Sequence, residues 1–182
     1  ITPIASITTD TTGIINLHGN IINTDLIFDF SSASSILLND NITLGTSELH
    51  LTSADFGNNT IDGNYNFTLY TNSLSWGAIG QDIALQNINI YSTDLALSIT
   101  ENINLAGDFN LELSSLALSS KVVTTGGNVS VNATNNITMT AKSQFSSADG
   151  DVDLLSQAGN INLGLLEAKN EINVTTSLGN IT

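Results

Sequence analysis

Apolar and polar residues alternate along this chain in short phrases that recur. The segment 159–163 reads Gly-Asn-Ile-Asn-Leu, and similar phrases begin at Gly150, Asn170 and Gly179. Alternation with a period of two is typical of a β-strand with one buried face, because successive side chains point to opposite sides of the strand. The recurring phrase therefore predicts many short strands of one kind, separated by turns.

The apolar residues form three series that advance along the chain together. In the first series the steps are 21, 25, 21, 21, 20, 23 and 20 residues, and the second series has its two longest steps in the same two turns. One insertion in each long turn explains this agreement. The first series is Ile21, Ile42, Phe67, Ile88, Phe109, Val129, Val152 and Ile172; the second is Phe28, Leu49, Leu74, Leu95, Leu116, Ile137, Ile161 and Ile181; the third is Ile15, Ile36, Ile61, Ile83, Ile103, Val123, Phe145 and Leu166.

Three strands in every 20–25 residues predict an all-β fold, a single parallel β-helix or three-sided β-solenoid, over residues 1–182. About eight turns, stacked at about 4.8 Å per strand, make a rod roughly 40 Å long. The residues of the three series point inward and form one narrow apolar core. Trp76, two residues after Leu74, is expected to fill that core.

The repeat is less regular in a few places. Residues 1–20 fit it least well, and no polar cap is evident at either end of the chain. The two long steps predict loop insertions near residues 52–64 and 141–150. The partner positions of the third series lose their apolar character near its end, where they hold Thr125, Ser147 and Ala168.

Turn residues stand just before the predicted strands, where the corners of the solenoid are expected. Asn and Asp hydrogen-bond neighbouring backbone groups, and asparagines can stack on one another along a solenoid. The residue before each first-series marker is polar: Asn20, Asn41, Asn66, Asn87, Asp108, Asn128, Asp151 and Glu171. Glycine adopts positive φ readily, and we expect this at corners formed by Gly19, Gly107, Gly127, Gly150, Gly159 and Gly179.

Composition excludes several classes of partner. The chain has 17 acidic residues against three lysines, and its formal net charge is −14. Since binding to phosphate groups needs cationic side chains, nucleic acid and anionic membrane surfaces are poor partners. No apolar run approaches the roughly 18 residues that span a bilayer, so no membrane insertion is expected. Cysteine is absent, which excludes disulfides and thiolate metal sites and is compatible with secretion.

Two longer phrases carry a resemblance to a known family. "GNVSVNATNNITM" and "GNINLGLLEAKNEINVTTSLGNIT" resemble the repeats of filamentous haemagglutinin-type bacterial exoproteins. This resemblance covers the chain from about Ile36 onward. It implies a right-handed parallel β-helix shaft of a large adhesin at the cell surface, with no catalytic residues to carry over. Proteins of this type are commonly exported by two-partner secretion, but the family's N-terminal secretion-domain motifs are not evident in this sequence. The chain starts at Ile1 without a signal peptide, so we expect a processed product or an excised segment.

One group of residues is a weak candidate for catalysis or metal binding. Polysaccharide hydrolases use paired carboxylates, and the only dense acidic cluster is Asp149, Asp151 and Asp153. The same three residues are weak calcium candidates, since calcium prefers oxygen ligands, but the stretch matches no EF-hand loop. We expect a solvated turn there, with no catalytic residue and no cofactor. His18 and His50 have no evident partners for a catalytic triad, and the lysines at 121, 142 and 169 are scattered.

Two hypotheses of function follow. The first is a non-enzymatic structural segment of an extracellular bacterial surface fibre or adhesin shaft, whose open ends bind other copies or adjoining segments of the same protein. The alternative is a carbohydrate-binding or polysaccharide-degrading β-helix, and host or surface glycans are candidate partners in either case. The first hypothesis is favoured because the chain has no arginine and, apart from the cluster at Asp149, no clustered carboxylates.

Overall fold

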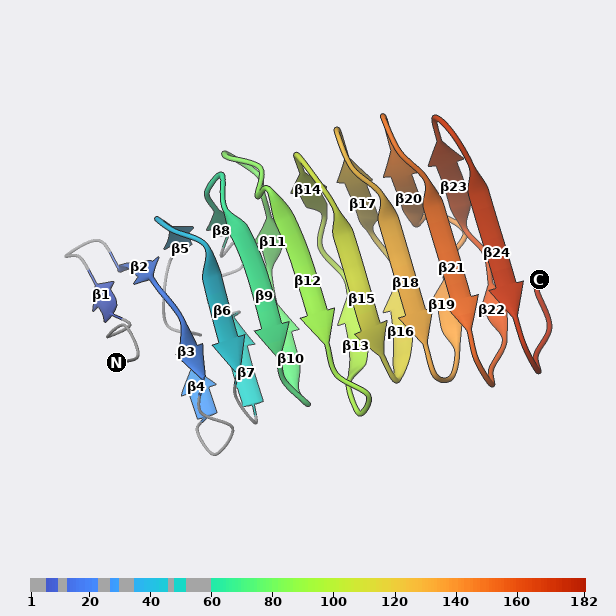
Figure 1. The fold of residues 1–182 in the computed structure, drawn as a ribbon, viewed down its shortest axis with the longest axis horizontal. Coiled ribbons are helices and arrows are strands. Elements are labelled where there is room, and N and C mark those ends of the chain that lie inside the picture. Colours follow the sequence, from blue (N-terminus) through green and yellow to red (C-terminus); the bar gives the residue numbers. More distant parts are fainter. Residues whose placement is uncertain (1–5, 10–12, 23–26, 30–34, 46–47, 52–59) are drawn as a thin grey trace.

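Short strands joined by tight corners wind into coils, and equivalent strands of successive coils form three walls around a common core (Figure 1). The computed structural model describes residues 6–9, 13–22, 27–29, 35–45, 48–51 and 60–182, and these contain no helix. In Figure 1 the nearer strands run downward and the farther strands upward as the chain advances from left to right, so the coils are right-handed. The predicted all-β, three-sided solenoid is confirmed.

The first wall is an eight-stranded parallel sheet that follows the first apolar series. Phe109 pairs with Ile88 on one side and with Val129 on the other, as the spacing predicts. This register holds without interruption from β6 to β24. Its strands are β3 (Ile21–Ile22), β6 (Ile42–Gly45), β9 (Asn66–Tyr70), β12 (Asn87–Tyr91), β15 (Phe109–Leu113), β18 (Val129–Ala133), β21 (Val152–Ser156) and β24 (Ile172–Thr176).

The second wall is divided into two parallel sheets, of three and four strands. The division lies between β10 and β13, which pack side by side without forming a ladder. The first sheet is β4 (Ile27–Asp29), β7 (Glu48–Leu51) and β10 (Leu74–Trp76); the second is β13 (Ala96–Ile99), β16 (Ser115–Leu118), β19 (Ile137–Met139) and β22 (Ile161–Asn162).

Two residues of the first and second series stand at other positions than predicted. Ile21 pairs with Leu44, two residues beyond its expected partner. Leu97, rather than Leu95, pairs with Leu116. Leu95 is buried all the same, at the corner that precedes β13. Spacing alone cannot distinguish an inward residue on a strand from one at a corner, as at Leu95, and it cannot detect a register shift of two residues, as at Ile21.

The third wall has nine strands, of which the first runs against the others. β1 pairs antiparallel with β2, from Ser6 opposite His18 to Thr9 opposite Ile15. The edge of this wall at the N-terminal end is therefore covered, although the sequence shows no evident cap there. The strands are β1 (Ser6–Thr9), β2 (Ile14–His18), β5 (Ser35–Leu38), β8 (Thr60–Asp62), β11 (Ala78–Ile79), β14 (Ile103–Leu105), β17 (Lys121–Thr124), β20 (Gln144–Ser147) and β23 (Leu165–Ala168).

The third series is wrong at two positions. Ile79 and Val122 are fully buried on the rungs that were predicted for Ile83 and Val123. Ile83 is 50% exposed. The error at Ile83 arose because its steps of 22 and 20 residues look regular, whereas the true steps around Ile79 are 18 and 24.

An outward excursion of the chain explains these unequal steps. Ile79 pairs with Ile103 and Leu85 with Leu105, so the five residues 80–84 lie opposite a single residue of the next coil. Gly80 opens the excursion with a φ of 66°, a conformation that costs glycine little. The Asp62 carboxylate, on the preceding coil, accepts hydrogen bonds from the backbone amides of residues 82 and 83, at 3.1 and 3.2 Å.

Each of the two ranges predicted as loop insertions contains a strand of the third wall. Residues 52–59 lie outside the described part of the chain, but residues 60–62 form β8 of the third wall. In the range 141–150, residues 144–147 form β20, so only the short turns on either side are irregular. The extra residues of this coil lie in the turn where Ser143 donates a backbone hydrogen bond to the Thr140 carbonyl at 3.0 Å.

Side chains of all three walls meet in one apolar core that runs the length of the described coils. Phe109 and Phe145 are fully buried and contact across the core, with ring centroids 6.3 Å apart. Trp76 is buried as predicted, and its Nε1 is the one buried polar side-chain atom in the described residues that lacks a hydrogen-bond partner. Polar residues replace apolar ones at the end of the third wall. Thr124 and Ser147 are buried there, and both hydroxyls donate to the Gly127 carbonyl at 2.7 Å.

Polar side chains at the start of the first-wall strands connect each coil to the next. Asp108 accepts a hydrogen bond from the Asn128 amide, and Asn128 accepts one from the Asp151 amide, both at 2.8 Å. The same contact is made by Asn41 to the amide of residue 66, at 3.0 Å. Because a strand begins at each of these corners, its first amide has no ladder partner of its own, and the side chain supplies the acceptor.

Glycine is required at most of these corners for space rather than for conformation. Of the six glycines predicted to have positive φ, only Gly19 does, at 74°. At Gly159, an added Cβ would lie 2.7 Å from the Asn135 carbonyl oxygen of the preceding coil, and at Gly150 it would lie 2.7 Å from the Gly127 carbonyl oxygen. The prediction of left-handed corners is therefore wrong for the other five. They allow close approach of the backbones of successive coils.

The corner ladder predicts a specific loss of stability when one of its acceptors is removed. Asn128→Ala should lower the free energy of unfolding by about 0.5–1.5 kcal/mol, since it removes one hydrogen bond at a partly solvated site. It should also speed hydrogen exchange at the Asp151 amide. Asn128→Asp keeps the acceptor, as Asp108 does one coil earlier, and should change both quantities little. Equal effects of the two substitutions in urea unfolding and hydrogen exchange would contradict the role of this contact.

Candidate functional site

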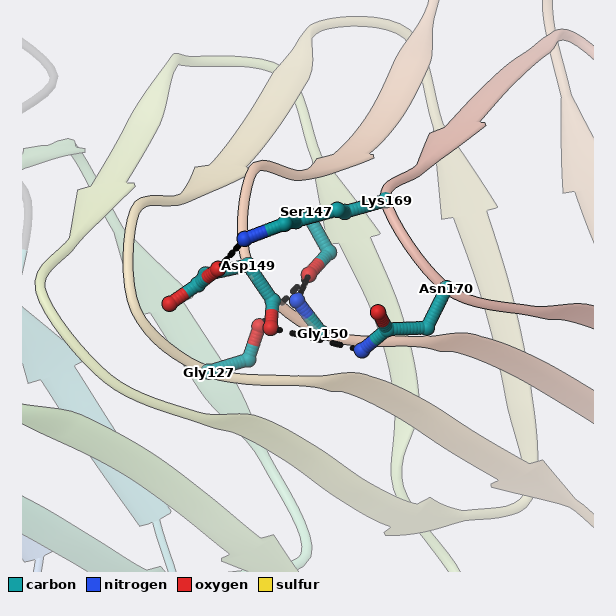
Figure 2. Close-up of polar contacts among 6 residues, drawn as sticks. All are labelled: Gly127, Ser147, Asp149, Gly150, Lys169 and Asn170. Atoms are coloured by element: carbon teal, nitrogen blue, oxygen red, sulfur yellow. Dashed lines mark hydrogen bonds and ion pairs between the residues drawn. The ribbon is translucent and has the colours of Figure 1, made fainter.

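The corner between β20 and β21 holds the acidic residues singled out from the sequence (Figure 2). Asp149 and Lys169, on successive coils, form an ion pair in which both side chains are more than half exposed. Asn170 donates to the Asp149 backbone carbonyl at 3.4 Å. The buried Ser147 hydroxyl accepts a hydrogen bond from the Gly150 amide at 2.8 Å, which holds the turn in shape.

The Lys169 ammonium lowers the pKa of Asp149 below its usual value, first by the hydrogen bond that it donates and then by its charge. Stability that depends on such a lowered pKa is present above the unfolded-state pKa and is lost as the pH falls through the folded-state value. Both groups are exposed to water, so this pair contributes little to stability. The pair therefore connects two coils at their corner without creating a reactive group.

The other two acidic side chains of the cluster have separate partners. Asp151 accepts a hydrogen bond from the Glu171 amide at 3.1 Å, and Asp153 accepts one from the Asn173 side chain at 2.9 Å. Within the described ranges, no three His, Cys, Asp or Glu side chains come together in a way that could hold a metal ion. These contacts link the acidic corner to the next coil, and the weak calcium site named from the sequence stays a prediction.

The two histidines and the other two lysines lie on separate parts of the chain. His18 is exposed at the end of β2, and the side chain of His50 lies outside the described part of the molecule. Lys121 begins β17, Lys142 lies in the turn before β20, and both are exposed. Among the described residues, no hydrogen bond or ion pair joins the side chains of His18, Lys121 or Lys142 to the Asp149 corner.

The outer face of the first wall presents regular rows of polar side chains, which we call the first-wall outer face. In one row, Asn110 donates to the Asn89 carboxamide oxygen at 2.9 Å, and Asn89 donates to the Thr68 hydroxyl at 3.4 Å. From β6 to β12 the outward residues carry no charge, whereas acidic residues enter this face at Asp108 and continue to Glu171. The outward residues of the neutral half are Asn41, Thr43, Gly45, Asn66, Thr68, Tyr70, Asn87, Asn89 and Tyr91.

Two tyrosines stand together in this neutral half. Tyr70 and Tyr91 end β9 and β12, and their rings stack with centroids 5.4 Å apart and an interplanar angle of 27°. They are 46% and 36% exposed. The three apolar series contain only positions predicted to point inward, so they did not predict this outward pair. The signal was present, because both tyrosines lie three residues after the first-series marker of consecutive repeats.

Shallow hollows lie on the outer surfaces of the other two walls. One, of about 320 Å³, is formed on the second wall by small side chains that include Ala96, Ser98 and Ala117. Another of similar volume lies on the third wall beside the 80–84 excursion and is lined by Gln81, Glu101 and others. Neither hollow brings together groups of a known catalytic arrangement.

The part of the chain that the structure describes holds no helix with the length and apolar character that helical membrane spans have. No protein-family model, curated protein or solved structure matches the chain. The fold and the surface chemistry of the walls are therefore the basis for the function proposed below.

The ion pair at the Asp149 corner predicts a specific titration. By NMR, the Asp149 carboxyl should titrate below about 3.9, the usual aspartate value, because ionised Asp149 is the form that pairs with Lys169. Lys169→Met should raise this pKa toward the usual value, and 1 M salt should raise it in the unsubstituted protein. Lys121→Met serves as the matched control, because Lys121 lies at the first residue of β17, whereas Lys169 follows the last residue of β23. An Asp149 pKa that is the same in all three proteins would refute the pairing in solution.

Proposed function

We propose that this chain is a structural segment of an extracellular bacterial surface fibre or adhesin shaft, of the filamentous haemagglutinin type. The observation that carries the proposal is the first wall, whose register is unbroken from β6 to β24. Each added coil lengthens such a rod by one strand spacing, about 4.8 Å, while contacting only its neighbours. A shaft of this kind separates binding regions from the cell and requires neither catalytic residues nor a cofactor.

The surface of the rod supports an extracellular role. The charge of −14 is spread over many coils, and only one lysine forms an ion pair among the described residues. A strongly negative surface keeps a protein soluble and repels other acidic polymers. Most inward positions are apolar, whereas one outward position of the first wall holds Gly45 opposite Tyr70 and Tyr91 opposite Glu112. A long repeat shaft can therefore change its surface without changing its core.

The C-terminal coil supplies a surface for contact with a further coil. Four of its apolar residues are exposed: Leu165 by 49%, Ile172 by 45%, Leu178 by 80% and Ile181 by 46%. β24, β23 and residues 180–182, which pair with β22, also present strand edges there, and such edges are templates for pairing with another strand. We infer that this end binds other copies or adjoining segments of the same protein. The N-terminal end differs, since β1 covers the edge of the third wall.

Immunogold electron microscopy of the cells that produce the protein tests the proposed location. Antibodies against the purified chain should label thin fibres outside intact cells, because a shaft segment is accessible on the surface. Labelling that appears only after the cells are permeabilised would show that the protein is not part of a surface fibre. An antibody against a cytosolic protein of the same cells is the control for intact envelopes.

The exposed C-terminal coil predicts a defined effect of substitution on assembly. At high concentration the purified chain should form rods longer than the roughly 40 Å of a single copy, by the strand spacing. The double substitution Leu178→Lys and Ile181→Lys should return it to single rods, because charged side chains resist burial between coils. Ile83→Lys, an equally exposed apolar position on the side of the rod, should leave assembly unchanged. Analytical ultracentrifugation and negative-stain microscopy would measure both.

Two outcomes would contradict this contact. Single rods at every concentration of the unsubstituted chain would exclude binding between copies and leave the adjoining-segment form of the proposal. Equal loss of assembly in the Ile83→Lys variant would show that association occurs through the sides.

A further inference from the structure

We propose that the stacked pair Tyr70 and Tyr91, together with the neighbouring side chains of Thr68, Asn89 and Asn110, forms a binding platform for a neutral polysaccharide. This function is separate from the shaft role and does not depend on it. A rod can carry a ligand site on its outward side chains without any change in its core.

The tyrosine pair supplies exposed aromatic surface for a ligand. Large aromatic side chains that remain 46% and 36% exposed are informative, since Tyr usually buries its ring and keeps only its hydroxyl in water. Here the backbone register places both rings on one open sheet face. At the same rung the preceding coil has Gly45, which adds no side chain, and the following coil has Glu112.

Hydrogen-bonding groups that could bind a ligand lie beside the two rings. A carboxamide has two N–H donors and two acceptor lone pairs. Asn89 uses one donor toward Thr68 and one lone pair toward Asn110, so a donor and a lone pair remain. On the other side of the rings, Ser92 donates to Asn72 at 3.0 Å. The rings are thus flanked on both sides by hydroxyl and amide groups that are held in place by contacts between coils.

The chemistry of the ligand follows from these two features. A pyranose ring has an apolar face of C–H groups and an edge of hydroxyl groups. Aromatic rings bury the apolar C–H face, and amide and hydroxyl groups form hydrogen bonds with the hydroxyl edge. Because equivalent groups recur on successive strands at about 4.8 Å, an extended chain of sugars fits this open face better than one small molecule does.

Charge restricts the class further. The first-wall outer face has no charged outward residue from β6 to β12, and the whole chain has a net charge of −14. An acidic polysaccharide would be repelled by the protein as a whole and would find no cationic partner on this face. A neutral polysaccharide is not repelled by the negative charge of the protein.

A second copy of the chain is the competing occupant. Stacked aromatics and asparagine ladders also form dry interfaces between identical sheets. The acidic half of the same face, from Asp108 to Glu171, opposes the side-by-side alignment of two rods because like charges would meet along it. The neutral ligand is therefore the better match for this surface.

The test uses the full chain and a panel of probes. Retention by insoluble cellulose, chitin and mannan is measured alongside binding to heparin at the same ionic strength. We expect binding to at least one neutral polysaccharide and none to heparin. The double substitution Tyr70→Ala and Tyr91→Ala should weaken that binding by about tenfold or more, and Asn89→Ala by a few-fold.

Matched controls separate this effect from a change in folding. Tyr65→Ala removes an equally exposed tyrosine at the other end of β9, 38% exposed, and should leave binding unchanged. The double Phe variant, Tyr70→Phe with Tyr91→Phe, keeps the stacked rings and should retain most of the affinity. Circular dichroism and the unfolding midpoint confirm that each variant is folded.

Three results would overturn the proposal. They are retention by none of the neutral polysaccharides, equal loss of binding in the Tyr65→Ala variant, and unaltered binding when both platform tyrosines are replaced. Concentration-dependent dimers that disappear in the double Ala variant, without polysaccharide binding, would assign the platform to a second copy instead.

Discussion

The parallel backbone ladder between successive coils is the constraint on which the rest of this structure depends. Most strands hydrogen-bond to their counterparts on the coils before and after, so one residue cannot shift along the rod unless its whole strand shifts with it. In the first wall this places Ile88, Phe109 and Val129 on one another, and the buried side chains follow the same order. One narrow core is the direct consequence, since every inward side chain meets its equivalents at the strand spacing.

Close stacking of the backbones also determines the corners. Where a strand begins, its first amide needs an acceptor, and side chains such as Asn128 supply it from the coil below. Where two corners lie too close for a Cβ, as at Gly159, only glycine fits. An insertion is tolerated if it leaves the wall entirely. The 80–84 excursion does so, and Asp62 satisfies two of its amides while Ile79 and Leu85 keep the rungs on either side.

The same arrangement separates shape from binding. Inward residues form the core that stabilises the rod, whereas outward residues can differ from coil to coil. The same strands can therefore form a shaft and hold a ligand platform. The neutral half of the first-wall outer face and its acidic half share one backbone register. Only the outward side chains distinguish the neutral half, where we propose the polysaccharide platform, from the acidic half.

The sequence by itself determined the architecture: the period of about 21 residues, the three walls, and the polar corner residues. It did so because inward positions are set by burial, which leaves a strict apolar period. Tertiary structure alone decided which residue took each rung where coil length varied, with Ile79 in place of Ile83 and Leu97 in place of Leu95. It also decided the antiparallel β1 and the meeting of Tyr70 with Tyr91, since edge pairing and outward contacts leave no apolar period to read.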